Sequence, residues 1–198
     1  MIAFVRHGQT AVNRAGQLQG RVDAPLTDLG VAQAQAVADV LSVEPTRVTR
    51  VVASPLCRAL DTATPIATAF SLKVEVDDRL VELDYGEWDQ RSLRDVAASE
   101  WTRWRADPHF APPGGESLVQ VGARVAEFCE ERIDEDLVVA VSHVSPIKGA
   151  VCWALGIDEQ ATWRMFLDLA SITRVGRRAG GPGYLATYNE TVAPVSPR

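Results

Sequence analysis

The stretch Leu137-Val138-Val139-Ala140-Val141-Ser142-His143 is the clearest sign of how this chain folds. It opens with five apolar residues, the length and composition that favour a buried β-strand. The run ends directly in Ser142-His143, which predicts polar side chains where the strand leaves the sheet. A second apolar run, Ile2-Ala3-Phe4-Val5, ends in the same way in Arg6-His7-Gly8.

Strand-like and helix-like segments alternate around these two runs. Further strands are expected at 48–53, 74–76, 172–175 and 184–188, and helices at about 27–41, 54–70, 116–133 and 147–155. Thr27 is typical of a helix N-cap, Ser54-Pro55 predicts the start of the next helix, and Pro65 predicts a kink or a short break within it. The alternation indicates an α/β fold, a three-layer α/β/α sandwich with a mostly parallel central sheet.

Composition narrows the classes of function. The 198 residues carry a formal net charge of −6, which argues against nucleic acid as a partner because phosphate backbones attract clustered positive charge. It gives no support for a membrane surface either, whereas a small anionic substrate needs only a local positive site. The apolar start is too short for a signal peptide, so a cytoplasmic location is expected.

The cysteines indicate a reducing compartment and no metal centre. Cys57, Cys129 and Cys152 are widely spaced and form no C-x-x-C pair. Neither a disulfide framework nor a structural zinc site fits that pattern, so we expect three small buried hydrophobic side chains.

Polar side chains at the strand ends indicate a phosphoryl site. Ligands of open α/β sheets bind beyond the carboxyl ends of the strands, where Arg6-His7, Ser142-His143 and Arg58 are expected to meet. Two arginines repel a metal cation but suit phosphate oxygens, and a histidine can attack phosphorus. An acid for the leaving oxygen is also needed. Spacing alone leaves Glu82, Asp84 and Glu87 as equal candidates.

Five motifs, in order, carry a resemblance to a known family. They are Arg6-His7-Gly8-Gln9-Thr10 with Asn13, Pro25 to Gly30, Ala53 to Ala59, Leu80 to Trp88 with Gly114 to Ser117, and Val141-Ser142-His143. Over about residues 2–156 the chain resembles the histidine phosphatase superfamily, also called phosphoglycerate-mutase-like.

The resemblance implies a role for each motif residue. His7 would be the nucleophile that forms a phosphohistidine, Arg6, Arg58 and His143 would hold the phosphoryl oxygens, and Glu82 would be the proton donor. Asn13 and Gln19 would lie on the rim of the phosphate pocket. The implied function is a histidine acid-type phosphatase that hydrolyses small phosphomonoesters without a metal or other cofactor.

The resemblance also leads to expectations for the rest of the chain. We expect a single histidine phosphatase domain over 1–198, with an aromatic-rich, irregular insert at about 84–115 over the active site and a loose tail at about 190–198. Tyr85 is the best candidate for a specificity residue. Val144 stands where the family usually has glycine, which bears on substrate choice. His109, in the insert, is either an exposed loop residue or a contact to the substrate.

Two other functions compete with the phosphatase. The first is a cofactor-dependent phosphoglycerate mutase, although mutases resembling these motifs usually have a longer insert than the 60 residues between Glu82 and His143. The second is a catalytically silent protein that binds phospho-ligands, which would be expected to lack one of the five catalytic residues. The substrate and the oligomeric state cannot be read from the sequence.

Overall fold

A six-stranded sheet forms the centre of the computed structural model, which describes residues 1–43 and 45–192. The strands are β1 (Ile2–Arg6), β2 (Val48–Ala53), β3 (Val74–Val76), β4 (Leu137–Ser142), β5 (Ser171–Arg177) and β6 (Gly183–Thr191), in the order β3-β2-β4-β1-β5-β6. The first four are mutually parallel, whereas β5 and β6 are antiparallel to their neighbours. The mostly parallel sheet expected from the sequence is confirmed.

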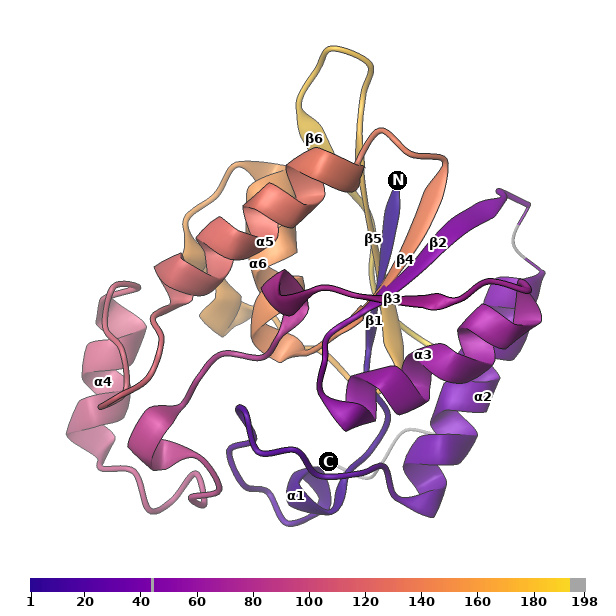
Figure 1. The fold of residues 1–198 in the computed structure, drawn as a ribbon. Helices are drawn as coiled ribbons and strands as arrows, with labels where there is room; N and C mark the ends of the chain where they lie inside the picture. The colour runs from indigo at the N-terminus through magenta and orange to yellow at the C-terminus, as the bar shows by residue number, and fades with distance from the viewer. Residues whose placement is uncertain (44, 193–198) are drawn as a thin grey trace.

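Helices cover both faces of the sheet (Figure 1). On one face lie α2 (Asp28–Ser42) and α3 (Cys57–Ala69), and on the other α5 (Leu118–Arg132) and α6 (Val144–Leu155). The smaller elements are α1 (Ala11–Arg14), α4 (Ala98–Ala106) and the 3-10 turns η1 (Asp78–Leu80), η2 (Gly86–Trp88) and η3 (Glu159–Arg164). The three-layer α/β/α arrangement is therefore confirmed.

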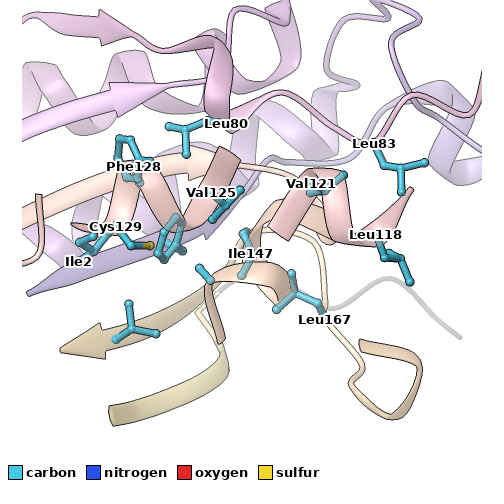
Figure 2. Packing of buried hydrophobic residues seen from close by; sticks show 14 of the residues in the cluster. Ile2, Leu80, Leu83, Leu118, Val121, Val125, Phe128, Cys129, Ile147 and Leu167 are labelled. Atoms are coloured by element: carbon cyan, nitrogen blue, oxygen red, sulfur yellow. The ribbon is translucent and has the colours of Figure 1, made fainter. Parts of the chain in front are cut away.

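The two hydrophobic cores follow from the alternation of side chains along the strands. Ile2 and Phe4 of β1 face α5 and α6, where Phe4 packs against Phe128 at 6.2 Å between ring centroids. Figure 2 shows Ile2 and Phe128 in this core. Ala3 and Val5 of the same strand join the core beneath α2 and α3. With both faces covered, β1 and β4 are buried throughout their apolar residues, as their unbroken hydrophobic runs indicate.

Several boundaries differ from the sequence-based expectation. Helix α3 begins at Cys57 with Leu56 as its N-cap and runs to Ala69 through Pro65 without a break, so Ser54-Pro55 is not its start. Helix α6 begins at Val144, three residues earlier than expected, and residues 80–115 are not wholly irregular because they contain η2 and α4.

The last described residues also differ from the expected tail. Glu190 and Thr191 pair with Ile172 and Ser171 in the sheet, while residues 193–198 of that tail lie outside the described part. All three cysteines are free, but Cys57 is partly exposed rather than buried. Among the described residues, no helix is long and apolar enough to cross a membrane.

Two glycines let the loop after β1 approach the start of α2. A β-carbon on Gly30 would overlap the carbonyl oxygen of Gln9, and one on Gly8 would overlap the carbonyl oxygen of Gly30. Thr27 caps α2 through a bond from the Gly30 N–H to its Oγ1, at 3.2 Å, as its position in the sequence predicts. The close approach fixes the segment that follows His7.

Candidate active site

The adjacent parallel strands β1 and β4 bring two histidines together at their carboxyl ends. Arg6 lies opposite Ser142 in the sheet, and the His7 N–H donates to the Ser142 carbonyl oxygen at 3.1 Å. The next residue on each strand is a histidine, and the His7 and His143 ring centroids are 5.1 Å apart. The sheet register alone therefore creates the pair.

His7 is held as a neutral imidazole with a defined tautomer. Its Nδ1 lies 2.7 Å from the Gly8 carbonyl oxygen, which can only accept a hydrogen bond. The hydrogen must then be on Nδ1, which leaves the lone pair on Nε2. Burial, and then the positive charges of Arg58 and Arg6, hold the pKa of His7 well below its ordinary value. Nε2 is therefore available as a nucleophile at neutral pH.

The two arginines are anchored by backbone carbonyl groups. Arg58 is fully buried and donates to the carbonyl oxygens of Val22 and Gly20 at 2.8 and 2.7 Å, and Arg6 donates to that of Leu167 at 2.6 Å. In both side chains Nε is buried and has no protein partner in the described structure. Burial lowers the pKa of Arg6 to about 10, so it stays charged at neutral pH.

His143 is fully buried and is oriented by a serine on the neighbouring strand end. Its Nε2 lies 2.8 Å from Oγ of Ser54, the residue that sequence reasoning assigned to a helix cap. Its Nδ1 is buried without a protein partner in the part of the chain described. Burial, followed by the charge of Arg58, lowers the pKa of His143 well below its usual range. A neutral ring is the result.

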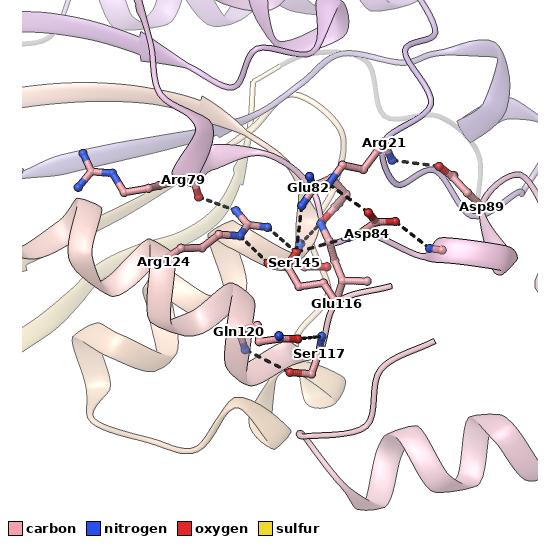
Figure 3. A network of polar contacts seen from close by, with 12 residues as sticks. Arg21, Arg79, Glu82, Asp84, Asp89, Glu116, Ser117, Gln120, Arg124 and Ser145 are labelled. Carbon is pink, nitrogen blue, oxygen red and sulfur yellow. Dashed lines mark hydrogen bonds and ion pairs between the residues drawn. The ribbon is translucent and has the colours of Figure 1, made fainter. Parts of the chain in front are cut away.

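Glu82 is the buried member of the three acid candidates. It is 4% exposed, and its carboxylate accepts three backbone hydrogen bonds, from Leu83 at 2.8 Å, Val144 at 3.0 Å and Ser145 at 3.1 Å. The last two donors are in the first turn of α6, which immediately follows His143 (Figure 3). The carboxylate is thus tied to the helix that begins at the second histidine.

The other two acid candidates lie in different surroundings. Asp84 is half-buried, accepts from the Gly86 N–H at 2.8 Å and lies 3.8 Å from Arg21 at the surface (Figure 3). Glu87 is exposed. Geometry thus separates Glu82 from the two residues that spacing could not exclude.

Asn13 and Gln19 both contact Thr10, with different consequences. Asn13 Oδ1 accepts from the Thr10 N–H at 3.1 Å and completes a capping box on α1, so its carbonyl oxygen is already used. Gln19 is buried, and its Oε1 accepts from Thr10 Oγ1 at 2.7 Å. Its Nε2 has no protein partner among the described residues. Nε2 of Gln19 is therefore a buried donor that is available to a ligand.

A pocket of about 540 Å³ opens beside Arg6. Its lining contains Tyr85 and Val144, the two residues expected to influence substrate choice, together with Arg6, Leu18, Leu93, Trp101, Trp104, Arg105, Lys148 and Trp163. His109 does not line it and is exposed in the loop after α4. We call this the aromatic pocket.

Sequence reasoning missed three residues of the aromatic pocket. Lys148 is the lone cation in the apolar helix α6, one turn after Val144, a signal that could have found it. Arg105 follows Trp104 on α4, in a segment read as irregular. Trp163 lies in η3, a turn for which the sequence shows no periodicity.

Comparison with known proteins identifies the family. The family profile described as the histidine phosphatase superfamily (branch 1) matches residues 2–191. The chain belongs to this superfamily. A phosphoserine phosphatase 1 from Hydrogenobacter thermophilus is 37% identical over 86% of this chain and 83% of its own length. The solved structure of a mycobacterial glucosyl-3-phosphoglycerate phosphatase with vanadate (VO3) superposes with a TM-score of 0.87 at 30% identity, covering 96% of this chain and 98% of the other.

Some relatives are much longer than this chain. A protein of Mycobacterium tuberculosis named as bifunctional is 36% identical over 96% of this chain, but the match covers 54% of the relative. The chain therefore spans about half the length of that relative.

Proposed function

We propose that this chain is a phosphatase that hydrolyses small phosphomonoesters through a phosphohistidine on His7, with no metal ion. The observation that carries the proposal is the geometry of His7. Its Nδ1 is paired with the Gly8 carbonyl, its pKa is lowered by burial and by Arg58 and Arg6, and it lies beside a second buried histidine. A neutral imidazole among fixed positive charges suits attack on an anionic phosphoryl group.

Unpartnered buried donors support binding of the phosphoryl group. Within the described structure, the Nε atoms of Arg6 and Arg58, Nδ1 of His143 and Nε2 of Gln19 are buried and lack a protein partner. Leaving a buried polar group unpaired costs about 1–3 kcal/mol, so such a cluster is stabilised by a ligand rich in acceptors. Phosphoryl oxygens are acceptors of the right charge.

The first step transfers the phosphoryl group to the enzyme. The lone pair on His7 Nε2 forms the N–P bond while the ester P–O bond breaks on the opposite side. Glu82 enters this step protonated and gives its proton to the departing oxygen, which leaves as a neutral alcohol. Arg6 and Arg58 neutralise the charge on the three remaining phosphoryl oxygens, and His143, a neutral imidazole, donates a hydrogen bond from Nδ1 to one of them.

The second step is hydrolysis of the phosphohistidine. Glu82, now a carboxylate, takes a proton from water, whose oxygen attacks phosphorus as the N–P bond breaks. Inorganic phosphate leaves, His7 recovers its lone pair, and Glu82 is again protonated. The backbone N–H groups of Leu83, Val144 and Ser145 hold the carboxylate in place during both transfers.

A screen of phosphate release over a panel of phosphomonoesters tests the proposal, with His7→Ala as the control. Turnover that depends on His7 and survives EDTA is expected. Near-normal turnover by His7→Ala would refute the assignment, and complete loss of activity in EDTA would refute metal independence.

The mutase alternative is less well supported. Relatives with phosphatase names, and the moderate separation of Glu82 from His143, favour water over a second alcohol as the phosphoryl acceptor. Incubation with 3-phosphoglycerate, with and without a bisphosphoglycerate primer, separates the two functions. Isomerisation without release of phosphate would identify a mutase.

Narrower expectations belong to this proposal as well. We propose one domain over 1–198 in which the segment at 84–115 lies beside the active site, supported by the lining of the aromatic pocket by Tyr85, Trp101 and Trp104. A cytoplasmic location and the histidine acid-type class stay predictions.

A further inference from the structure

The aromatic pocket is lined by cations and hydrogen-bond donors without an acidic partner. Arg6, Arg105 and Lys148 line it, and its described lining includes no aspartate or glutamate. Two of its indole groups also have an unpaired N–H donor, since Nε1 of Trp104 and of Trp163 are buried with no partner among the described residues. Such a lining complements a ligand that brings negative charge and acceptors of its own.

Lys148 is the best-placed of these cations to recognise a ligand. It lies one helical turn after Val144 on α6, so both side chains lie on the face that borders Glu82 and Arg6. Lys148 is half-buried, and among the described residues its ammonium forms neither a hydrogen bond nor an ion pair. The charge of Glu82 acts on this ammonium without pairing with it, and a desolvated cation that lacks a paired anion is costly unless a ligand supplies one.

Arg105, on α4, lines the same pocket. Its guanidinium is 5.9 Å from the centre of the Trp101 ring and 5.8 Å from that of Trp163, and no described carboxylate pairs with it. A cation–π contact does not require the guanidinium N–H donors, which are therefore available to an acceptor. α4 and η3 are joined here by bonds from Gln160 Nε2 to the carbonyl oxygens of Arg105 and Ala106.

We propose that Lys148, together with Arg105, binds a second anionic group on the leaving alcohol, so that the substrates are phosphomonoesters of acidic alcohols. The inference rests on the proposed function and deepens it. When the phosphoryl group is bound at His7, the rest of the substrate extends past Arg6 into the aromatic pocket. The second anionic group of the substrate then lies next to Lys148. The pocket volume of about 540 Å³ accommodates alcohols longer than three carbons.

Matched substrates isolate the second anion. One pair is D-3-phosphoglycerate and D-glycerol 3-phosphate, which share the configuration at C2, and the other is 6-phosphogluconate and sorbitol 6-phosphate. Within each pair the only difference is a carboxylate in place of a hydroxymethyl group. For at least one pair we expect the wild-type kcat/KM to be about tenfold or more higher for the acid, as is typical of one charge-assisted hydrogen bond.

Lys148→Met should remove this preference, so that the ratio of kcat/KM values for acid and alcohol falls about tenfold, with the larger part of the loss in KM for the acid. Lys148→Arg should restore most of the ratio because it restores the charge. Lys73 is the only other lysine in the chain and is exposed, so Lys73→Met is the matched control and should leave the ratio unchanged.

Two results would overturn the inference while leaving the phosphatase intact: equal kcat/KM within both pairs, or an equal loss for acid and alcohol in Lys148→Met, which is the mark of a merely structural lysine. If all four esters and p-nitrophenyl phosphate go unhydrolysed and His7 takes up no phosphate, the proposed function fails and the inference fails with it.

Discussion

Ser54 and His143 meet across two neighbouring parallel strand ends, with Oγ of the serine 2.8 Å from Nε2 of the histidine. The Ser54 N–H also donates to the Val141 carbonyl at 3.0 Å, which holds the serine against β4. Both side chains are fully buried. Oγ of Ser54 also accepts the Leu56 N–H at 3.4 Å, which leaves its own hydrogen for Nε2 of His143. In that arrangement the ring hydrogen is on Nδ1, the atom left without a protein partner, and we expect the serine to orient this N–H toward a bound ligand.

Ser54→Ala should therefore weaken catalysis although Ser54 does not touch the reacting atoms. Losing the partner of a buried nitrogen costs about 1–3 kcal/mol, which predicts a fall of about tenfold or more in kcat/KM for p-nitrophenyl phosphate. Ser99→Ala, at an exposed position of α4, is the matched control. Unchanged kinetics in Ser54→Ala would mean that the bond does not orient His143.

Glu82→Gln should slow turnover by at least about a hundredfold, since the amide can neither give nor take the proton. The substitution also places an NH₂ group where a carboxylate oxygen accepts backbone N–H bonds in the wild-type protein, so that donor faces donor. The substitution should slow the hydrolysis of the phosphohistidine as well as its formation. Because hydrolysis is slow, the variant should retain phosphate on His7 after rapid quenching. Glu87→Gln changes an exposed acid in the same segment and should behave as wild type. Equal activity of the two variants would exclude Glu82 as the proton donor.

His7 and His143 should both stay neutral well below pH 6.5. The folded-state pKa of each is lowered by burial and nearby positive charge, so the proton-free form persists on the acidic side of the usual histidine range. Imidazole nitrogen chemical shifts followed from pH 8 to 5.5 check this, with His7→Ala and His143→Ala to assign the signals. Conversion of either ring to imidazolium near pH 6.5 would contradict it.

The ammonium of Lys148 predicts an upper pH limit on kcat/KM that depends on the substrate. Burial lowers its pKa to about 8, while Glu82 raises it, Arg6 lowers it and Cys152 raises it. The ammonium is therefore charged below about pH 8 and loses its charge as the pH rises. We expect kcat/KM for the preferred acidic substrate to fall above about pH 8, relative to its hydroxymethyl partner. In Lys148→Arg the guanidinium stays charged, so the relative fall should disappear. If the relative fall in kcat/KM persists in Lys148→Arg, a titrating group other than Lys148 causes it.

Gly30→Ala should destabilise the fold, because the new methyl would overlap the Gln9 carbonyl in the loop that follows His7. Overpacking of this kind typically costs about 1–3 kcal/mol in the free energy of unfolding. Gly149→Ala in α6 is the control, since its nearest neighbour, Gly122 Cα, would be at an ordinary 3.5 Å. Urea denaturation measures both. A Gly30→Ala protein as stable as wild type would show that the loop can move.

Periodicity predicted the layers, the parallel sheet and the convergence of His7 with His143, because buried strands are continuous in sequence and their ends meet by register. Ser54 was misread because Ser-Pro is typical of helix starts, whereas its hydroxyl bonds to a residue 89 positions away. Such a tertiary contact leaves no local signal. The choice of Glu82 came from the family resemblance, and its burial and its backbone hydrogen bonds to Val144 and Ser145 separate it from Asp84 and Glu87. Lys148 escaped notice because an apolar helix with one lysine resembles an ordinary core helix.

The first turns of α6 contribute main-chain N–H groups to one part of the site and side chains to another. The carboxylate of Glu82 is fixed by main-chain N–H groups at 144 and 145, which every residue except proline provides. The side chains at 144 and 148 face the aromatic pocket instead. We therefore expect that replacing these side chains changes which alcohol the pocket accepts, while Glu82, the proposed proton donor, keeps its backbone hydrogen bonds.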